Sequence, residues 1–166
     1  MANLRLIALC NVTYKIVTKA IANRLKPIMN HMISENQSAF VLGRLITDNI
    51  MVAFEMQHFL KWKTQGMIGY AELKLDISKA YDIIECSLLR AIVLKLGFAE
   101  KWVNLVLHCI SMVEYFVLNQ GEEIGPIYPK RVLRQGDPIS PYLFLLVAKS
   151  FSALLREFDR GKNCML

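Results

Sequence analysis

The stretch LKLDISKAYD, residues 73–82, restricts the fold of this chain more than any other segment. From Tyr70 to Ile77, apolar side chains at the odd positions alternate with polar or aromatic ones at the even positions. This period of two predicts a β-strand with one face in the core. Asp76 then lies on the other face at the strand's end, where a rigid sheet can hold a carboxylate toward an open cleft. An aspartate here is also typical of a helix cap or turn, and that alternative stays open.

The other segments read mainly as helices. Asn11 is a candidate N-cap for a helix that runs towards Lys26 and Pro27, and a second helix begins near Thr47 or Asp48 and ends at 65–66. The side chains that this second helix is expected to place toward a core are Ile50, Phe54, Phe59 and Leu60. Further expected elements are helices over 86–98 and 99–112 with a stop at Gly97, a strand over 114–120, a turn at Gly121, a return arm with Pro126 and Pro129, and a helix that begins at Ser140 and Pro141. The fold class is α+β, helix-rich with a small antiparallel sheet.

Composition favours a single domain that carries some apolar surface for a partner. Of the 166 residues, 54% are apolar and 20% charged, without a linker-like stretch. The longest apolar run, 142–148, is too short to span a membrane, and no convincing signal peptide is present. We therefore expect an intracellular protein, in nucleus or cytoplasm, with no membrane partner. The four cysteines lack metal-ligand spacing and are expected to be free thiols: Cys10, Cys86, Cys109 and Cys164.

The net charge of +6 is consistent with a polyanionic partner but does not establish one. In the first helix, the basic residues Lys15, Lys19, Arg24 and Lys26 are set among the apolar residues Val12, Ile16, Val17, Ile21 and Leu25. This spacing predicts one apolar and one basic face. The basic face can lie along a phosphate backbone, or it can be an ordinary solvated helix face.

Asp76 and the segment RQGDPISP, residues 134–141, together suggest phosphoryl transfer. That chemistry uses carboxylates to hold two magnesium ions, one at the attacking hydroxyl and one at the leaving phosphate. Asp76 supplies an oxygen ligand of the kind that Mg²⁺ prefers. Gln135 and Gly136 would offer an amide side chain and close backbone approach to a nucleotide.

Four ordered blocks carry a resemblance to a known family. They are LCNVTYKIVTKAIANRLKPIM, ISENQSAFVLGRLITDNI, LKLDISKAYD and LRQGDPISPYLFLL. In this order they resemble the reverse transcriptase of non-LTR, LINE-type retrotransposons, most similar to those of plants. The resemblance implies part of a right-hand polymerase fold, with residues 1–69 fingers-like and 70–166 palm-like. It implies an RNA template, a DNA primer and deoxynucleoside triphosphates as partners, with Mg²⁺ as cofactor.

The resemblance also implies residue roles around the LKLDISKAYD block. Asp76 would be a metal-binding aspartate of the palm, with the Ile77 carbonyl as an additional ligand. Tyr81 would lie beneath the incoming deoxynucleotide and exclude a 2′-hydroxyl by bulk; its alternative is plain core packing. Asp82 is expected to shape the loop or cap a helix, not to bind metal.

Further positions are implied to contact nucleotide or nucleic acid. Gln135 and Gly136 correspond to the family's nucleotide- and template-contacting turn, and Arg134 before them is a candidate phosphate contact.

Two other blocks add three residues to this set. Arg5, in NLRLI, corresponds to an arginine that contacts the incoming triphosphate, or is a surface arginine near a chain end. Phe40 and Arg44 would contact RNA by stacking and by phosphate pairing.

The sequence departs from the family pattern in ways that leave two functions open. Leu6 and Leu42 replace prolines of the pattern, and the family's next block, an aromatic-Ala-Asp-Asp hairpin with the remaining metal carboxylates, is not reached by Leu166. The first hypothesis is an RNA-directed DNA polymerase domain that acts within a full-length parent. The second is a non-catalytic nucleic-acid-binding remnant or a decayed retroelement fragment. In either case this chain alone is expected to be inactive.

Overall fold

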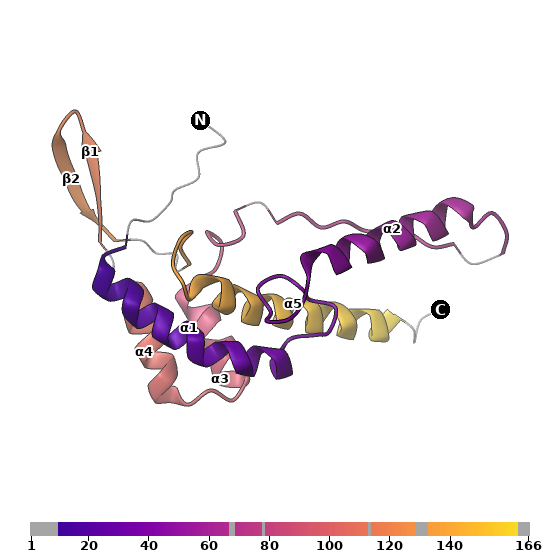
Figure 1. Ribbon diagram of the computed structural model, residues 1–166, viewed down its shortest axis with the longest axis horizontal. Helices are drawn as coiled ribbons and strands as arrows, with labels where there is room; N and C mark the ends of the chain where they lie inside the picture. Colours follow the sequence, from indigo (N-terminus) through magenta and orange to yellow (C-terminus); the bar gives the residue numbers. More distant parts are fainter. Residues whose placement is uncertain (1–9, 67–68, 78, 113, 129–132, 163–166) are drawn as a thin grey trace.

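The computed structural model describes residues 10–66, 69–77, 79–112, 114–128 and 133–162. In chain order the elements are α1 (Val12–Met32), α2 (Ile46–Trp62), α3 (Cys86–Lys95), α4 (Glu100–Ser111), β1 (Tyr115–Asn119), β2 (Glu122–Ile127) and α5 (Ser140–Lys162). Figure 1 shows α1, α3, α4 and the first half of α5 gathered into one helical body, from which the hairpin and α2 extend at opposite ends. The α+β class is confirmed. No helix in the described ranges is long and apolar enough to cross a membrane.

Helix α1 begins where the sequence predicts and ends later. The Asn11 Oδ1 accepts a hydrogen bond from the Tyr14 backbone N–H at 2.8 Å, which satisfies one of the free amides of the first turn. The predicted end near Pro27 is wrong, because the helix continues through this proline to Met32. Met29 and Ile33 are buried beyond it, so packing of the last turn outweighs the local cost of a proline.

The core lies between α1, α3, α4 and α5. Its fully buried side chains include Leu25, Leu89, Ile110, Leu143 and Leu146. The apolar face predicted for α1 is correct only in its second half. Ile21 and Leu25 are buried, whereas Val12 and Ile16 are exposed.

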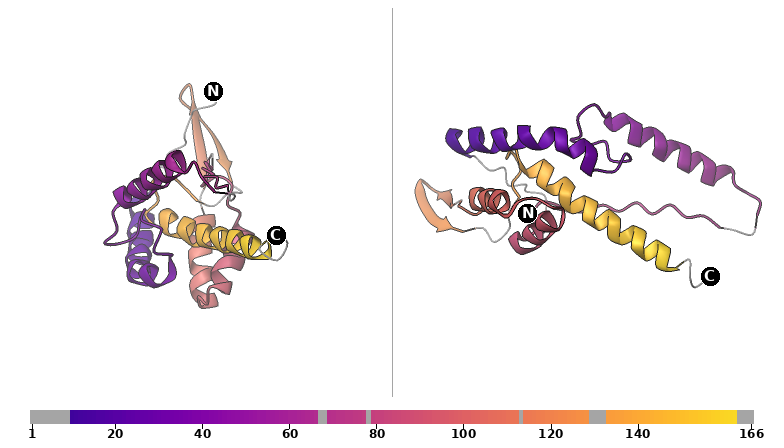
Figure 2. Two further views of the ribbon diagram at one scale, coloured as in Figure 1. Left: turned by 90° about the vertical axis from the view of Figure 1, so that its right-hand side faces the viewer. Right: turned by 90° about the horizontal axis from the view of Figure 1, so that it is seen from below.

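The turns and strands of the second half of the chain lie close to where the sequence predicts them. Gly97 ends the α3 segment with a φ of +90°, a left-handed conformation that glycine adopts without steric cost. Strands β1 and β2 pair antiparallel, and Asn119 opposite Glu122 closes the hairpin around Gly121. Pro126 lies within β2, while the predicted Pro129 lies outside the described residues. Figure 2 shows the hairpin projecting from the helical body.

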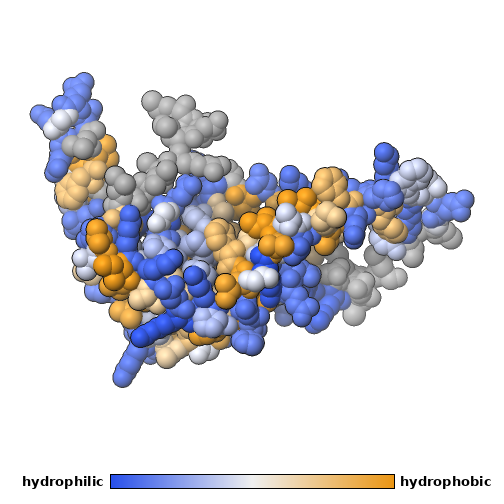
Figure 3. Space-filling view, in the orientation of Figure 1, coloured by the Kyte–Doolittle hydropathy of each residue, from blue (hydrophilic) through white to orange (hydrophobic). Residues whose placement is uncertain are grey.

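Helix α2 forms, but the predicted packing of its apolar side chains is wrong. None of its residues is buried, and Ile50, Phe54 and Phe59 are exposed. In the space-filling view of Figure 3, hydrophobic side chains show on the surface around the first turns of α2 and the loop before it. The apolar spacing thus predicted a helix correctly, but spacing alone does not supply an element to pack against.

The predicted strand over 70–77 is also wrong for the described structure. This segment has no regular secondary structure, and its apolar face is open, with Leu73 79% exposed. A strand requires a neighbour to complete its hydrogen bonds. The sheet of the described residues contains β1 and β2 alone.

Two leucines of α5 test where the core ends. Leu146 is 0% exposed and Leu154 is 63% exposed, on the same helix. We expect Leu146→Ala to lower the free energy of unfolding by about 2 to 5 kcal/mol, because it leaves a cavity. Leu154→Ala, the matched control, should change it by no more than about 0.5 kcal/mol. Chemical denaturation measures both, and equal losses would place the end of α5 in the core.

Candidate nucleotide-binding site

The turn before α5 exposes the two residues that the sequence selected. Gln135 and Gly136 are exposed, whereas Arg134 and Asp137 on either side are 4% and 3% exposed. Gly136 has a φ of +99°, which a residue with a side chain rarely adopts. The turn therefore presents an amide side chain and a bare backbone to solvent between two buried anchors.

Arg134 holds the turn to the neighbouring helices. Its backbone N–H donates to the Ser140 Oγ at 3.0 Å, and its Nη2 donates to the Ile110 carbonyl at 2.6 Å. Ile110 lies in the last turn of α4, where carbonyl groups have no partner within the helix and the helix dipole favours a cation. The guanidinium is buried against α4, so a phosphate would have to compete with the Ile110 carbonyl for it, and the phosphate contact of Arg134 stays a prediction.

The second anchor joins α1 to the turn. The Tyr14 hydroxyl donates to the Asp137 Oδ2 at 2.6 Å, and the Asp137 Oδ1 accepts from the Ile139 backbone N–H at 3.2 Å. Burial, followed by this hydrogen bond, raises the pKa of Tyr14 well above its ordinary range. Sequence reasoning missed the pair, because nothing in the local pattern links two residues 123 positions apart.

Tyr81 is brought to the same helix. Its ring contacts the Phe144 ring edge-on, with centroids 5.3 Å apart and an interplanar angle of 65°. The ring is half-buried, and this burial raises the pKa of Tyr81. Through this contact the KAYD block packs against the first turns of α5, the helix that follows the turn at 134–140. Core packing covers only part of the Tyr81 side chain, and the rest of it is accessible to solvent.

Asp76 and Ile77 are exposed, in the extended segment that precedes Tyr81. The turn after them is closed by the Asp82 backbone N–H, which donates to the Lys79 carbonyl at 2.8 Å. Asp82 therefore shapes this loop through its backbone N–H. Within the described ranges, no group of three or more His, Cys, Asp or Glu is placed to hold a metal ion. A two-magnesium centre needs several carboxylates together, and the described residues do not present such a group.

The loop between α1 and α2 is braced from within. Arg44 Nη1 donates to the carbonyl of Ser34 and, at 2.7 Å, to that of Gln37. Ser38 Oγ donates to the Asn49 Oδ1 at 3.0 Å. The predicted pairing of Arg44 with RNA phosphate must compete with these two carbonyls. Phe40 is 58% exposed and has a φ of +61°, an unusual conformation for a bulky residue.

The remaining predicted contacts are on or before α1. Lys15, Lys19 and Arg24 are exposed, and Lys26 is half-buried. In an α-helix, Lys15 and Lys19 share one face, and Arg24 lies roughly on the opposite side from Lys15. The predicted single basic face is therefore limited to the lysines. Arg5 lies outside the described residues.

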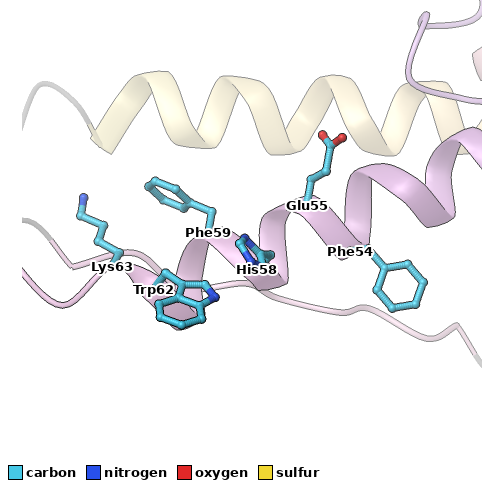
Figure 4. A pocket seen from close by; sticks show the side chains of 6 residues that line it. All are labelled: Phe54, Glu55, His58, Phe59, Trp62 and Lys63. Atoms are coloured by element: carbon cyan, nitrogen blue, oxygen red, sulfur yellow. The ribbon is translucent and has the colours of Figure 1, made fainter.

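A groove of about 770 Å³ lies on α2, away from these residues in sequence. Phe54, Glu55, His58, Phe59, Trp62 and Lys63 line it. Figure 4 shows their side chains spread along the helix, with Phe59 and Glu55 on the side toward α5. Its walls are mostly apolar and contain none of the predicted site residues.

Comparison with known proteins gives a consistent result. A family model described as reverse transcriptase (RNA-dependent DNA polymerase) matches residues 1–166. The chain is 32% identical over 155 residues to the transposon TX1 uncharacterized 149 kDa protein of Xenopus laevis, covering 93% of this chain and 12% of that protein.

Two further relatives match shorter parts. The retrovirus-related Pol polyprotein from type-1 retrotransposable element R2 of Popillia japonica is 24% identical over 108 residues, 65% of this chain and 18% of that protein. An uncharacterized mitochondrial protein of Arabidopsis thaliana is 51% identical over 42 residues, 25% of this chain and 34% of that protein. The matches thus span between 12% and 34% of the length of these relatives.

The raised pKa of Tyr14 gives a test in alkali. Below the ordinary tyrosine pKa of 10.0, folded and unfolded chains both keep this proton. Above it the unfolded chain alone loses the proton, so the free energy of unfolding falls as pH rises. We expect a steeper fall for the wild type than for Tyr14→Phe between about pH 10 and 12, by less than the roughly 1.4 kcal/mol per pH unit of a full proton, because the side chain is partly solvated.

Urea denaturation at several pH values measures this slope. Tyr70→Phe, in an exposed segment, is the matched control and should retain the wild-type slope. Equal slopes for the wild type and Tyr14→Phe would contradict a raised pKa of the half-buried Tyr14 hydroxyl.

Proposed function

Since this chain belongs to the reverse transcriptase family, as a domain of a LINE-type, non-LTR retrotransposon protein, we propose that it supplies the fingers and part of the palm of an RNA-directed DNA polymerase. Residues 1–69 are assigned to the fingers and 70–166 to the palm. The observation that carries the proposal is the contact of Tyr81 with Phe144 in the first turns of α5, the helix that the exposed Gln135–Gly136 pair precedes. Polymerisation itself is assigned to a whole protein and not to this chain alone. The match to the Xenopus laevis relative covers only 12% of that protein.

The exposed turn is proposed to contact the incoming deoxynucleotide and the template. Gln135 offers donor and acceptor groups, and Gly136 has no side chain to keep a base or sugar away from the backbone. Tyr81, fixed edge-on against Phe144, is proposed to lie beneath the sugar and to exclude a 2′-hydroxyl by bulk. Arg5 is proposed to contact the triphosphate.

Asp76 is proposed as one carboxylate of a magnesium site, with the Ile77 carbonyl beside it. Magnesium in such an enzyme stabilises charge on the transferring phosphate. Asp76 is exposed and so is accessible to a cation, and we propose that the remaining ligands come from other parts of the whole protein. The contribution assigned to this chain is therefore one ligand and the nucleotide-facing turn, not a complete metal centre.

The template and primer are proposed to lie along α1 and the loop after it. Lys15 and Lys19 are exposed on one face of the helix, and Arg24 adds a charge on another. Phe40 presents an exposed ring from a braced loop, which suits stacking on an unpaired RNA base. Contacts of this kind bind through phosphate and aromatic faces, so they are largely independent of sequence.

We expect the chain to bind an RNA–DNA duplex weakly and to lose affinity as salt rises. The double variant Lys15→Gln, Lys19→Gln should lower the slope of log affinity against log salt by about 0.7 to 0.9 for each phosphate that the protein no longer neutralises. The control Lys95→Gln, Lys101→Gln removes the same charge from exposed positions on α3 and α4. Fluorescence anisotropy at several salt concentrations measures both. Equal effects of the two variants would reject the α1 surface, and salt-independent binding would reject the nucleic-acid interface.

We expect no primer extension by the 166-residue chain alone, because Asp76 by itself cannot hold two magnesium ions in the geometry of in-line attack. The assay contains purified protein, an RNA template with a DNA primer, deoxynucleotides and Mg²⁺, beside an Asp76→Ala control and a complete reverse transcriptase. Both the wild type and the variant should be inactive. Extension by the wild type that disappears in Asp76→Ala would show that other carboxylates of this chain complete the site.

A further inference from the structure

We infer that Tyr14 is a positioning residue for the nucleotide-facing turn: its hydroxyl fixes the Asp137 carboxylate and thereby the exposed Gln135–Gly136 pair. This inference rests on the proposed function of that turn. Neither the sequence blocks nor the relatives assign a role to this tyrosine. The structure does so through one short hydrogen bond between α1 and the turn.

Tyr14 contacts the two buried residues that flank the exposed pair. On one side its hydroxyl lies 2.6 Å from the Asp137 Oδ2. On the other side the Arg134 guanidinium carbon lies 5.6 Å from the centre of its ring, within cation–π range. A single side chain from α1 therefore spans the turn from its first anchor to its second.

The Asp137 carboxylate transmits this contact to the backbone. The Asp137 Oδ1 accepts a hydrogen bond from the Ile139 backbone N–H, and the Asp137 backbone carbonyl accepts one from the Ser140 N–H at 3.3 Å. Because the residue is buried, a carboxylate oxygen that loses its donor must be left unsatisfied or rotate toward water. Rotation would remove the acceptor from Ile139 and loosen the turn directly after Gly136.

The same hydroxyl is not needed for the helix to form or pack. The capping bond of α1 uses the Tyr14 backbone N–H, not its side chain. The buried contacts of α1 are made further along, by Thr18, Ile21, Ala22, Leu25 and Met29. Tyr14→Phe keeps the ring and these contacts, so its effect should concentrate in the turn.

Hydrogen exchange by NMR on the intact chain tests the positioning. In Tyr14→Phe we expect the Ile139 amide to exchange roughly tenfold faster or more, from loss of a hydrogen bond to a charged group. Amides of α3 and α4 should keep their wild-type rates. The control Tyr128→Phe also removes a phenol that donates to a carboxylate, Glu114 at 3.0 Å, but in the exposed hairpin. It should leave the turn unchanged.

A double-mutant comparison assigns the effect to the Tyr14–Asp137 bond. Asp137→Ala removes the acceptor, so adding Tyr14→Phe to it should change the Ile139 exchange rate little further. Additive effects would mean that the hydroxyl acts elsewhere and would overturn the inference. Faster exchange throughout the core in Tyr14→Phe would likewise overturn it, because that result marks a general loss of stability.

The functional readout is the side-chain amide resonance of Gln135 on addition of a short RNA–DNA template-primer duplex. We expect a shift in the wild type and in Tyr128→Phe, and a shift at least several-fold smaller in Tyr14→Phe. An undiminished shift in Tyr14→Phe would overturn the inference. No shift in the wild type would reject the proposed function of the turn, whereas the exchange rates would still decide whether Tyr14 positions it.

Discussion

The burial of the Arg134 side chain is the constraint on which the arrangement of the second half of the chain depends. A guanidinium in the interior is costly unless its N–H groups find acceptors. It finds one at the Ile110 carbonyl, in the last turn of α4, while its own backbone is tied to Ser140 at the start of α5. These two hydrogen bonds together fix the spacing of α4 and α5 and the path of the turn at 134–140. The exposed Gln135 and Gly136 follow from that geometry.

The features that could be predicted from the sequence are those decided within a few residues. The Asn11 cap, the stop at Gly97, the hairpin around Gly121 and the start of α5 at Ser140 each depend on local hydrogen bonding or on a backbone angle. The same holds for the exposed glycine turn of the candidate site. Its chemistry could be anticipated because glycine and an amide side chain have the same properties wherever the turn is placed.

The features that could not be predicted depend on distant partners. Alternation over 70–77 indicates a strand, but a strand exists only beside another one. The apolar spacing of α2 likewise indicates a buried face without indicating what buries it, and all of its residues are partly or fully exposed. Arg134 was assigned to a phosphate because an arginine beside a candidate nucleotide-binding turn suits a phosphate contact as well as it suits a structural role. Its burial against α4, and the bond from Tyr14 to Asp137, depend on tertiary packing.

The backbone of Phe40 has a consequence for the evolution of the loop after α1. A side chain in the left-handed region costs roughly 1 to 2 kcal/mol relative to an ordinary conformation, and glycine would remove most of that cost. Selection for stability alone would therefore favour replacement of this ring, which is exposed and contributes little to the core. The aromatic residue at this position therefore presents a flat apolar surface to solvent at a cost in backbone energy.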